Sequence, residues 1–145
     1  MADFKYFTLK ELCASEVATK KKIDNFPSFT VVENLTELTK NILDPLRVAW
    51  GSSIKVTSGY RCDALNKAVG GVSTSAHRLG YAADLQPGNG KIDEFGKFVK
   101  DWLIRNRIRF DQVLFETQGK TKWVHIGIRS TSGSQRGETK NLIVK

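Results

Sequence analysis

The chain has 145 residues, of which 40% are hydrophobic and 26% are charged. This length suits one domain, and the composition is that of a globular protein rather than a disordered one. Lys and Arg number 23 against 15 Asp and Glu, giving a net charge of +8. That excess favours an anionic partner such as nucleic acid, an anionic membrane or an anionic cell wall.

Charged residues interrupt every apolar stretch, so no run approaches the roughly 18 residues of a membrane span. The segment from Met1 to Lys10 contains no apolar core followed by a small-residue cleavage site. We therefore expect neither a membrane span nor a secretory signal. Without export, Cys13 and Cys62 are expected to be free thiols rather than a disulfide.

Two helix starts are visible in the first third of the chain. Thr8 and Glu11 have the spacing of a capping box, which predicts a short helix after Thr8. Asn34 resembles a second cap, because apolar residues follow it at intervals of three and four. Pro45 lies inside this apolar stripe and is expected to kink the helix. The stripe consists of Leu35, Leu38, Ile42, Leu46 and Trp50.

The rest of the chain predicts strands and two further helices. Strands are expected at 54–56 and 82–85, and helices at 63–69 and 92–103. Residues 110–116 and 122–128 are expected to form two strands joined by the loop 118–121. Residues 129–145 are expected to be a loop with a short tail. This order indicates an α+β fold, in a single domain over 1–145 with its core from about 7 to 128.

The sequence has only two histidines, His77 and His125. His77 opens a segment that ends at Asp84, and both residues are of types that bind zinc. In one continuous helix these two side chains would lie roughly 10 Å apart along the axis, too far to share an ion. Gly80 offers a turn between them, so that a loop and the following strand can bring them together.

Strand alternation places His125 beside Gly127 on the more open face of its strand. The predicted loop pairs Glu116 with Trp123 and Leu114 with His125. Glu116 is then diagonal to His125, within about 7–8 Å between Cα atoms. This distance suits a carboxylate beside the metal's water rather than a ligand. A register shifted by one residue would turn Glu116 away, leaving it a solvated charge at a strand end.

Two histidines and one aspartate provide three ligands and leave a fourth position open, as a catalytic zinc site requires. Such an ion would polarise a carbonyl and lower the pKa of its bound water to roughly 7. Glu116 is the candidate base, and then acid, for the leaving amine. Arg61 is the candidate to bind a substrate carboxylate or the developing oxyanion, with a surface arginine as the alternative. Gln112 shares a strand face with Glu116 and is a further candidate for substrate binding.

Other catalytic and binding patterns are absent from the sequence. There is no HExxH zinc motif and no GxSxG nucleophile elbow. Aromatic residues do not alternate with basic ones as a single-strand nucleic-acid platform requires. We therefore expect no specific nucleic-acid partner.

Three segments resemble motifs of the M15 family of zinc D-Ala-D-Ala peptidases, specifically its short bacterial and phage forms. They are Ser58–Arg61 (SGYR), Ser75–Asp84 (SAHRLGYAAD) and Trp123–His125 (WVH). The similarity extends from about Phe7 to Ile128. It implies a fold like that of the D-Ala-D-Ala peptidases and the hedgehog signalling domain, an antiparallel sheet with helices packed against it.

The resemblance also implies roles for the matching residues: His77, Asp84 and His125 as zinc ligands, and Arg61 and Ser75 in contact with the substrate. Many relatives carry the catalytic carboxylate two or three residues before the second histidine, where this chain has Lys122 and Trp123. The end of the preceding strand is the other known arrangement, and Glu116 matches it.

The expected function is therefore zinc-dependent hydrolysis of amide bonds in peptidoglycan stem peptides, by a monomer made without a signal peptide, as in phage lysis. Carboxypeptidase and endopeptidase activities are both open. The alternative is a zinc-containing binding module without turnover on the same fold. The positive charge is expected to help the protein adhere to anionic wall polymers.

Overall fold

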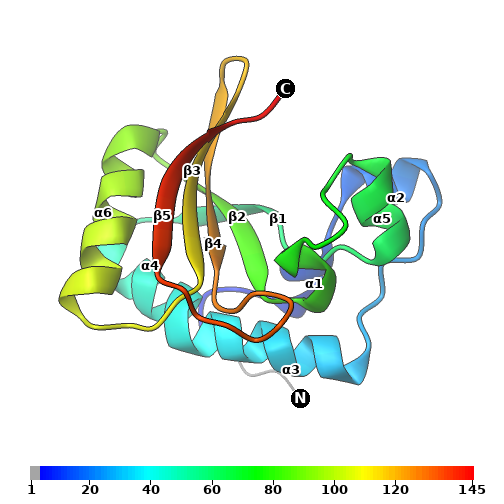
Figure 1. The fold of residues 1–145 in the computed structure, drawn as a ribbon, viewed down its shortest axis with the longest axis horizontal. Coiled ribbons are helices and arrows are strands. Elements are labelled where there is room, and N and C mark those ends of the chain that lie inside the picture. The colour runs from blue at the N-terminus through cyan, green and yellow to red at the C-terminus, as the bar shows by residue number, and fades with distance from the viewer. Residues whose placement is uncertain (1–3) are drawn as a thin grey trace.

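The computed structural model describes residues 4–145 (Figure 1). At its centre lies a five-stranded sheet with the strand order β1-β2-β4-β3-β5. Neighbouring strands are antiparallel except β3 and β5, which run parallel. The predicted α+β class is confirmed, with a mixed and mostly antiparallel sheet. The strands are β1 (Ile54–Ser58), β2 (Ala82–Pro87), β3 (Gln112–Gln118), β4 (Thr121–Gly127) and β5 (Glu138–Ile143).

Helices surround this sheet on several sides. In Figure 1, α6 stands beside the strands, α3 and α4 run below them, and α2 and α5 form a lobe on the far side of β1 and β2. Within residues 4–145, no helix combines the length and apolar character needed to cross a bilayer. The helices are α1 (Leu9–Cys13), α2 (Glu16–Lys20), α3 (Phe29–Leu38), α4 (Asp44–Trp50), α5 (Asp63–Ala68) and α6 (Ile92–Arg105), with a π-helical stretch η1 (Thr39–Leu43) and a 3-10 helix η2 (Ala76–Leu79).

The long helical segment starts earlier than predicted. Ser28, not Asn34, caps α3, and its hydroxyl accepts a hydrogen bond from the Val31 N–H at 3.2 Å. Asn34 lies within α3, and its side-chain amide donates to the Leu79 carbonyl at 2.8 Å. This bond ties α3 to η2. Pro45 lies in the first turn of α4, where a missing N–H costs nothing, and the irregularity falls just before it in η1.

The predicted register of the β3–β4 hairpin is confirmed. Glu116 is paired with Trp123 and Leu114 with His125. The loop is shorter than predicted, because Gln118 also pairs with Thr121 and leaves only two residues in the turn. Gly119 occupies the first of these with a φ of +61°, a conformation that glycine adopts without steric cost.

The expected loop and tail at 129–145 are wrong for residues 138–143, which form the edge strand β5. Its sequence alternates weakly, and most of its side chains are exposed, so no buried face marks it as a strand. Parallel pairing with β3 also leaves no hairpin turn as a signal. Arg136 fixes the start of β5 through two hydrogen bonds of 2.8 Å from its guanidinium to the buried Asp111 carboxylate.

One hydrophobic cluster of buried residues extends from Phe7 to Ile128 and fills the space between the sheet and the helices. The strands contribute alternate residues to it, so the other residues of β2, β3 and β4 point to the opposite face. That opposite face carries the candidate site. The main contributors from α6 and the sheet are Phe95, Val99, Leu103, Leu85, Val113, Val124 and Ile126.

Candidate active site

Two neighbouring strands place an aspartate and a histidine side by side. Asp84 on β2 is the register partner of His125 on β4, and both side chains leave the sheet on the face away from the core. Both residues are 8% exposed. Their proximity follows directly from the antiparallel pairing, because opposed residues of neighbouring strands project to the same side.

His77 reaches the same point from the 3-10 helix η2. The Ser75 hydroxyl caps this helix by accepting a hydrogen bond from the His77 N–H at 3.2 Å. Gly80 ends it in the left-handed conformation, with a φ of +78°, and turns the chain into β2. The turn expected at Gly80 thus brings His77 and Asp84 together, although they are seven residues apart.

The three side chains converge on one small volume. His77 Nε2 lies 3.2 Å from Asp84 Oδ1 and 3.2 Å from His125 Nδ1, and the last two atoms are 3.0 Å apart. Tetrahedral zinc ligands at about 2.0–2.1 Å from the metal lie about 3.3 Å from one another. The observed triangle therefore has the size of one face of a zinc coordination tetrahedron, with the fourth corner left to another ligand.

The tautomer of His77 fits a metal ligand. Its Nδ1 lies 2.7 Å from the Gly59 carbonyl, which can only accept, so Nδ1 carries the proton. Burial lowers the pKa of His77, and the neutral ring then presents the lone pair of Nε2 to the other two groups. Acceptor atoms this close require a cation or a proton between them, and a backbone carbonyl behind a histidine is a common support for a metal ligand.

Gly59 belongs to the motif Ser58–Arg61 and contacts His77 in the motif Ser75–Asp84. Its carbonyl orients His77, and the next residue but one, Arg61, donates its backbone N–H to the His77 carbonyl at 3.0 Å. A Cβ at Gly59 would overlap the Leu12 carbonyl of α1, so the backbone passes here only because this residue is glycine. Gly59 is therefore a positioning residue for His77.

Arg61 enters the site without an ion pair to any acidic residue in the range 4–145. The contacts of its guanidinium are long: 3.5 Å to the Ser58 hydroxyl and 3.4 Å to that of Ser75. Its Nε is buried and has no hydrogen-bond partner among the described residues. Burial lowers the pKa of Arg61, although the nearby Asp84 and Glu116 oppose that shift. A buried guanidinium with unused donors is suited to receive an anionic group of a ligand.

Glu116 lies on the same sheet face as His125, two residues along β3 from Leu114, the register partner of His125. Its carboxylate accepts a short hydrogen bond from the Trp123 indole N–H. Burial, reinforced by the negative charge of Asp84, raises the pKa of Glu116. A carboxyl with a raised pKa, fixed next to three candidate ligands, is suited to accept a proton and release it again.

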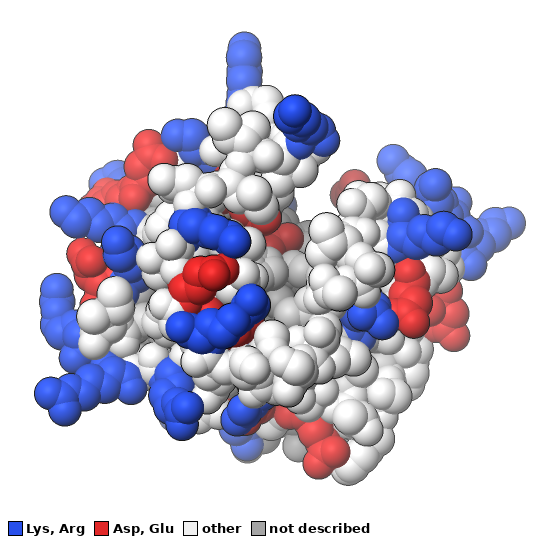
Figure 2. All heavy atoms as spheres, in the orientation of Figure 1, with Lys and Arg blue, Asp and Glu red and all other residues white. Residues whose placement is uncertain are grey.

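The site lies in a cleft of about 830 Å³. One wall is the segment from Val69 to His77, and the other is formed by β3, β4 and the end of β5. In Figure 2 a hollow separates the strands from the α2–α5 lobe. Gln112 also lines the cleft, but its amide donates to Glu138 at 2.6 Å, so that donor is already used.

The structure brings together all the residues predicted for the site and adds three supporting ones, Gly59, Trp123 and Asn25. Trp123 orients Glu116, and the hairpin register predicted from the sequence already places these two residues opposite each other. Asn25 was not foreseen: its amide donates to the Cys13 and Tyr60 carbonyls and accepts from the Cys62 N–H, at 2.8–2.9 Å. No local pattern marks it, because all its contacts are distant in sequence.

A mixed sheet whose open face carries a buried His–Asp–His group in a cleft is an arrangement found in metal-dependent hydrolases. The sequence model of the family described as Peptidase M15 matches residues 5–127 of the chain. This match covers most of the chain, which therefore belongs to the M15 family of metallopeptidases. No curated protein matches the chain.

Proposed function

We propose that this peptidase hydrolyses amide bonds in the stem peptides of peptidoglycan and that its metal is zinc. The observation that carries the zinc assignment is the triangle of two imidazole nitrogens and one carboxylate oxygen, 3.0–3.2 Å on each side. Nitrogen and oxygen donors in this number leave one position for water or substrate. The substrate class rests on family membership and on the motif resemblance.

Each residue of the site has a proposed role in the reaction. When bound, zinc would supply the Lewis acidity that activates water and polarises the scissile carbonyl. Glu116 takes a proton from the attacking water and delivers it to the nitrogen of the leaving amine, so the amide gains the elements of water. Arg61 binds the substrate's carboxylate or the negative charge that develops on the carbonyl oxygen, and Ser75 holds the loop beside it.

The proposed setting is the bacterial wall, attacked by a phage lysis enzyme. This proposal is supported by the likeness of the three motifs to the short bacterial and phage forms of the family. The products of digestion distinguish a carboxypeptidase from an endopeptidase.

Mass spectrometry of muropeptides after digestion tests this proposal. The zinc-loaded protein is incubated with purified peptidoglycan, and the Glu116→Gln variant serves as the matched control. Released D-alanine would identify a carboxypeptidase, and a new pair of peptide termini within the stem or cross-link would identify an endopeptidase. A protein that binds zinc but leaves the muropeptides intact would overturn the proposal in favour of a binding module without turnover.

A further inference from the structure

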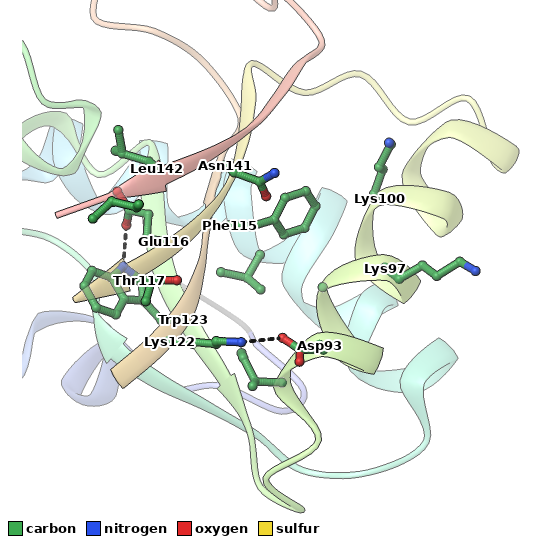
Figure 3. Close-up of a pocket in the computed structure, with 14 residues that line it drawn as sticks. Asp93, Lys97, Lys100, Phe115, Glu116, Thr117, Lys122, Trp123, Asn141 and Leu142 are labelled. Carbon is green, nitrogen blue, oxygen red and sulfur yellow. Dashed lines mark hydrogen bonds and ion pairs between the residues drawn. The ribbon is translucent and has the colours of Figure 1, made fainter. Parts of the chain in front are cut away.

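A second groove lies between α6 and the strands β3, β4 and β5, mainly on the α6 side of the sheet (Figure 3). The three candidate zinc ligands do not line it, but it shares Glu116, Trp123, Leu142 and Ile143 with the active-site cleft. Its volume is about 400 Å³. The floor is apolar and includes Phe115 and Val124, whereas Lys97, Lys100 and Lys122 line its sides. None of the proposed catalytic steps uses these lysines.

The groove exists because α6 covers only part of the sheet. The helix packs on β2 and β4, and at Gly96 it lies so close that a Cβ would approach the Phe115 ring to 3.0 Å. The added edge strand β5 extends the sheet beyond the reach of the helix. The half-buried Phe115 and the exposed Asn141 lie there, and the open strip between helix and edge strand is the groove.

Three lysines and two carboxylates, Asp93 and Glu116, line the groove, so its net charge is positive by one. Lys122 is paired with Asp93 at 3.1 Å, but neither Lys97 nor Lys100 forms an ion pair with any residue in the described range 4–145. These two lysines are three residues apart on α6, so they lie on neighbouring positions of one helix face. Asn141 adds a neutral amide from the opposite side.

The three ammonium groups extend in different directions and do not converge on one point (Figure 3). Such an arrangement suits a chain with separated negative charges better than one small anion, which would need donors gathered around it. The apolar floor matches uncharged carbon links between those charges. The two aromatic residues of the groove lining, Phe115 and Trp123, leave the sheet on opposite faces, so they do not form a row of rings on which successive nucleic-acid bases could stack.

We propose that this groove binds a polyol-phosphate polymer of the bacterial wall, with its phosphates at Lys97 and Lys100 and its carbon links over Phe115. The choice of a wall polymer rests on the proposed function, whereas the preference for a chain with spaced phosphates rests on the groove itself. Lys97, Lys100 and Phe115 lie on the α6 side of the sheet, and none of the three candidate zinc ligands lines the groove, so a polymer bound there leaves the ligands accessible. It would hold the peptidase on the wall while the peptides are cut.

Binding of deacylated poly(glycerol phosphate) tests the proposal, since this polymer contains no amide bond and is not a substrate. Affinity is measured for the zinc-loaded protein and for two double variants, K97E/K100E and K20E/K21E. Each double variant lowers the net charge from +8 to +4, because each exchange of Lys for Glu removes one positive charge and adds one negative charge. The second pair lies on the α2 side of the molecule and controls for overall charge.

We expect K97E/K100E to weaken binding on the order of tenfold or more, and K20E/K21E to change it by less than about threefold. Equal losses in both variants, or no binding by the unaltered protein, would overturn the assignment of the groove. A single-stranded DNA with as many phosphates, bound more tightly and released by the same K97E/K100E exchange, would replace the wall polymer with nucleic acid.

Hydrolysis of isolated stem peptides separates this inference from the proposed function. These peptides carry no polymer, so K97E/K100E is expected to cleave them as fast as the unaltered protein does. Cleavage without polymer binding would remove the groove proposal alone. Polymer binding without cleavage of any peptide would remove the peptidase proposal and leave a polyanion groove.

Discussion

At the scale of single residues, Glu116 is the most informative residue to exchange. The Glu116 side chain is positioned by register and by the Trp123 indole, and it lies beside the candidate ligands without being one of them. Exchange of this residue should therefore separate turnover from metal binding. Exchange of a ligand would remove both together.

Glu116→Gln is expected to lower kcat by roughly 10²- to 10⁴-fold, because the amide cannot accept the proton of the attacking water. Zinc affinity, measured by competition with a chromogenic chelator, should stay within a few-fold. Trp123→Phe keeps the carboxylate and loses only the orienting N–H, so its kcat should fall less. Full activity of Glu116→Gln would show that another group is the base.

The thiol of Cys13 provides a pH-dependent prediction. Burial raises the pKa of Cys13 to about 11 from its ordinary value of 9.0. Because the thiolate is the reactive form, alkylation at pH 8 should be at least about tenfold slower in the folded chain than in denaturant. The rate should increase as the pH rises from 9 towards 11. The raised pKa also makes stability depend on pH. It stabilises the folded state below pH 9, and this contribution to the free energy of unfolding is lost as the pH rises towards 11.

The measurement uses Cys62→Ser, which leaves Cys13 as the only thiol. Serine retains the capping role of residue 62, whose sulfur accepts from the Leu65 N–H in α5. Equal alkylation rates in the folded and the denatured chain at pH 8 would contradict the assigned burial of Cys13.

At the scale of elements, the close crossing of β1 and α1 holds the site together. Gly59 follows β1 directly, its backbone passes against the Leu12 carbonyl, and its own carbonyl orients His77. A side chain there must push the two elements apart. Such a side chain should therefore lower both the free energy of unfolding and the affinity for zinc.

Gly59→Ala is expected to lower the free energy of unfolding by roughly 1–3 kcal/mol, the usual cost of overpacking, and to weaken zinc binding by roughly 10- to 100-fold. Gly127→Ala is the matched control, because a Cβ at Gly127 would meet its nearest neighbours at an ordinary 3.7 Å. Urea denaturation of the metal-free proteins compares the two variants. Equal stability of both would contradict the close contact at Gly59.

The sequence predicted the elements whose signals are local. The hairpin register, the capping at Thr8 and the turn at Gly80 depend on residues close together in the chain, and all three are confirmed. The start of α3 was misplaced because Asn34 looks like a cap but bonds to Leu79 in another element. The edge strand β5 was missed because its partner is distant in sequence and its own side chains are mostly exposed.

The candidate ligands could be predicted from the sequence, whereas the residues that support them could not. The three candidate ligands follow from the two histidines, the turn at Gly80 and the motif resemblance. Their distances depend on the pairing of β2 with β4, which no local pattern specifies. The carbonyl of Gly59 and the amide of Asn25 act across long sequence separations, so only the folded structure reveals them.

At the scale of the whole molecule, we expect the ionic strength to distinguish the proposed adhesion to the wall from catalysis. Lys and Arg side chains are distributed over much of the face shown in Figure 2, and the net charge is +8. The candidate metal ligands and Glu116, by contrast, are at least partly buried, and their proposed interactions act over short distances. Added salt screens the first kind of interaction much more than the second.

Raising the ionic strength from about 0.05 M to about 0.5 M is therefore expected to release the protein from sedimented cell walls. Hydrolysis of a short soluble stem peptide over the same range should change by less than about threefold. Cosedimentation and a peptide assay provide the two measurements. Wall binding that does not respond to salt would contradict the role assigned to the positive charge.

The central claim is that His77, Asp84 and His125 hold one zinc ion and leave it an open position. The zinc K-edge absorption spectrum of the purified, zinc-loaded protein tests it most directly. We predict one zinc per chain in a four-coordinate shell of nitrogen and oxygen at about 2.0–2.1 Å, with two imidazoles. Sulfur in the shell, which would indicate Cys13 or Cys62, or a spectrum unchanged by His125→Ala, would contradict the account.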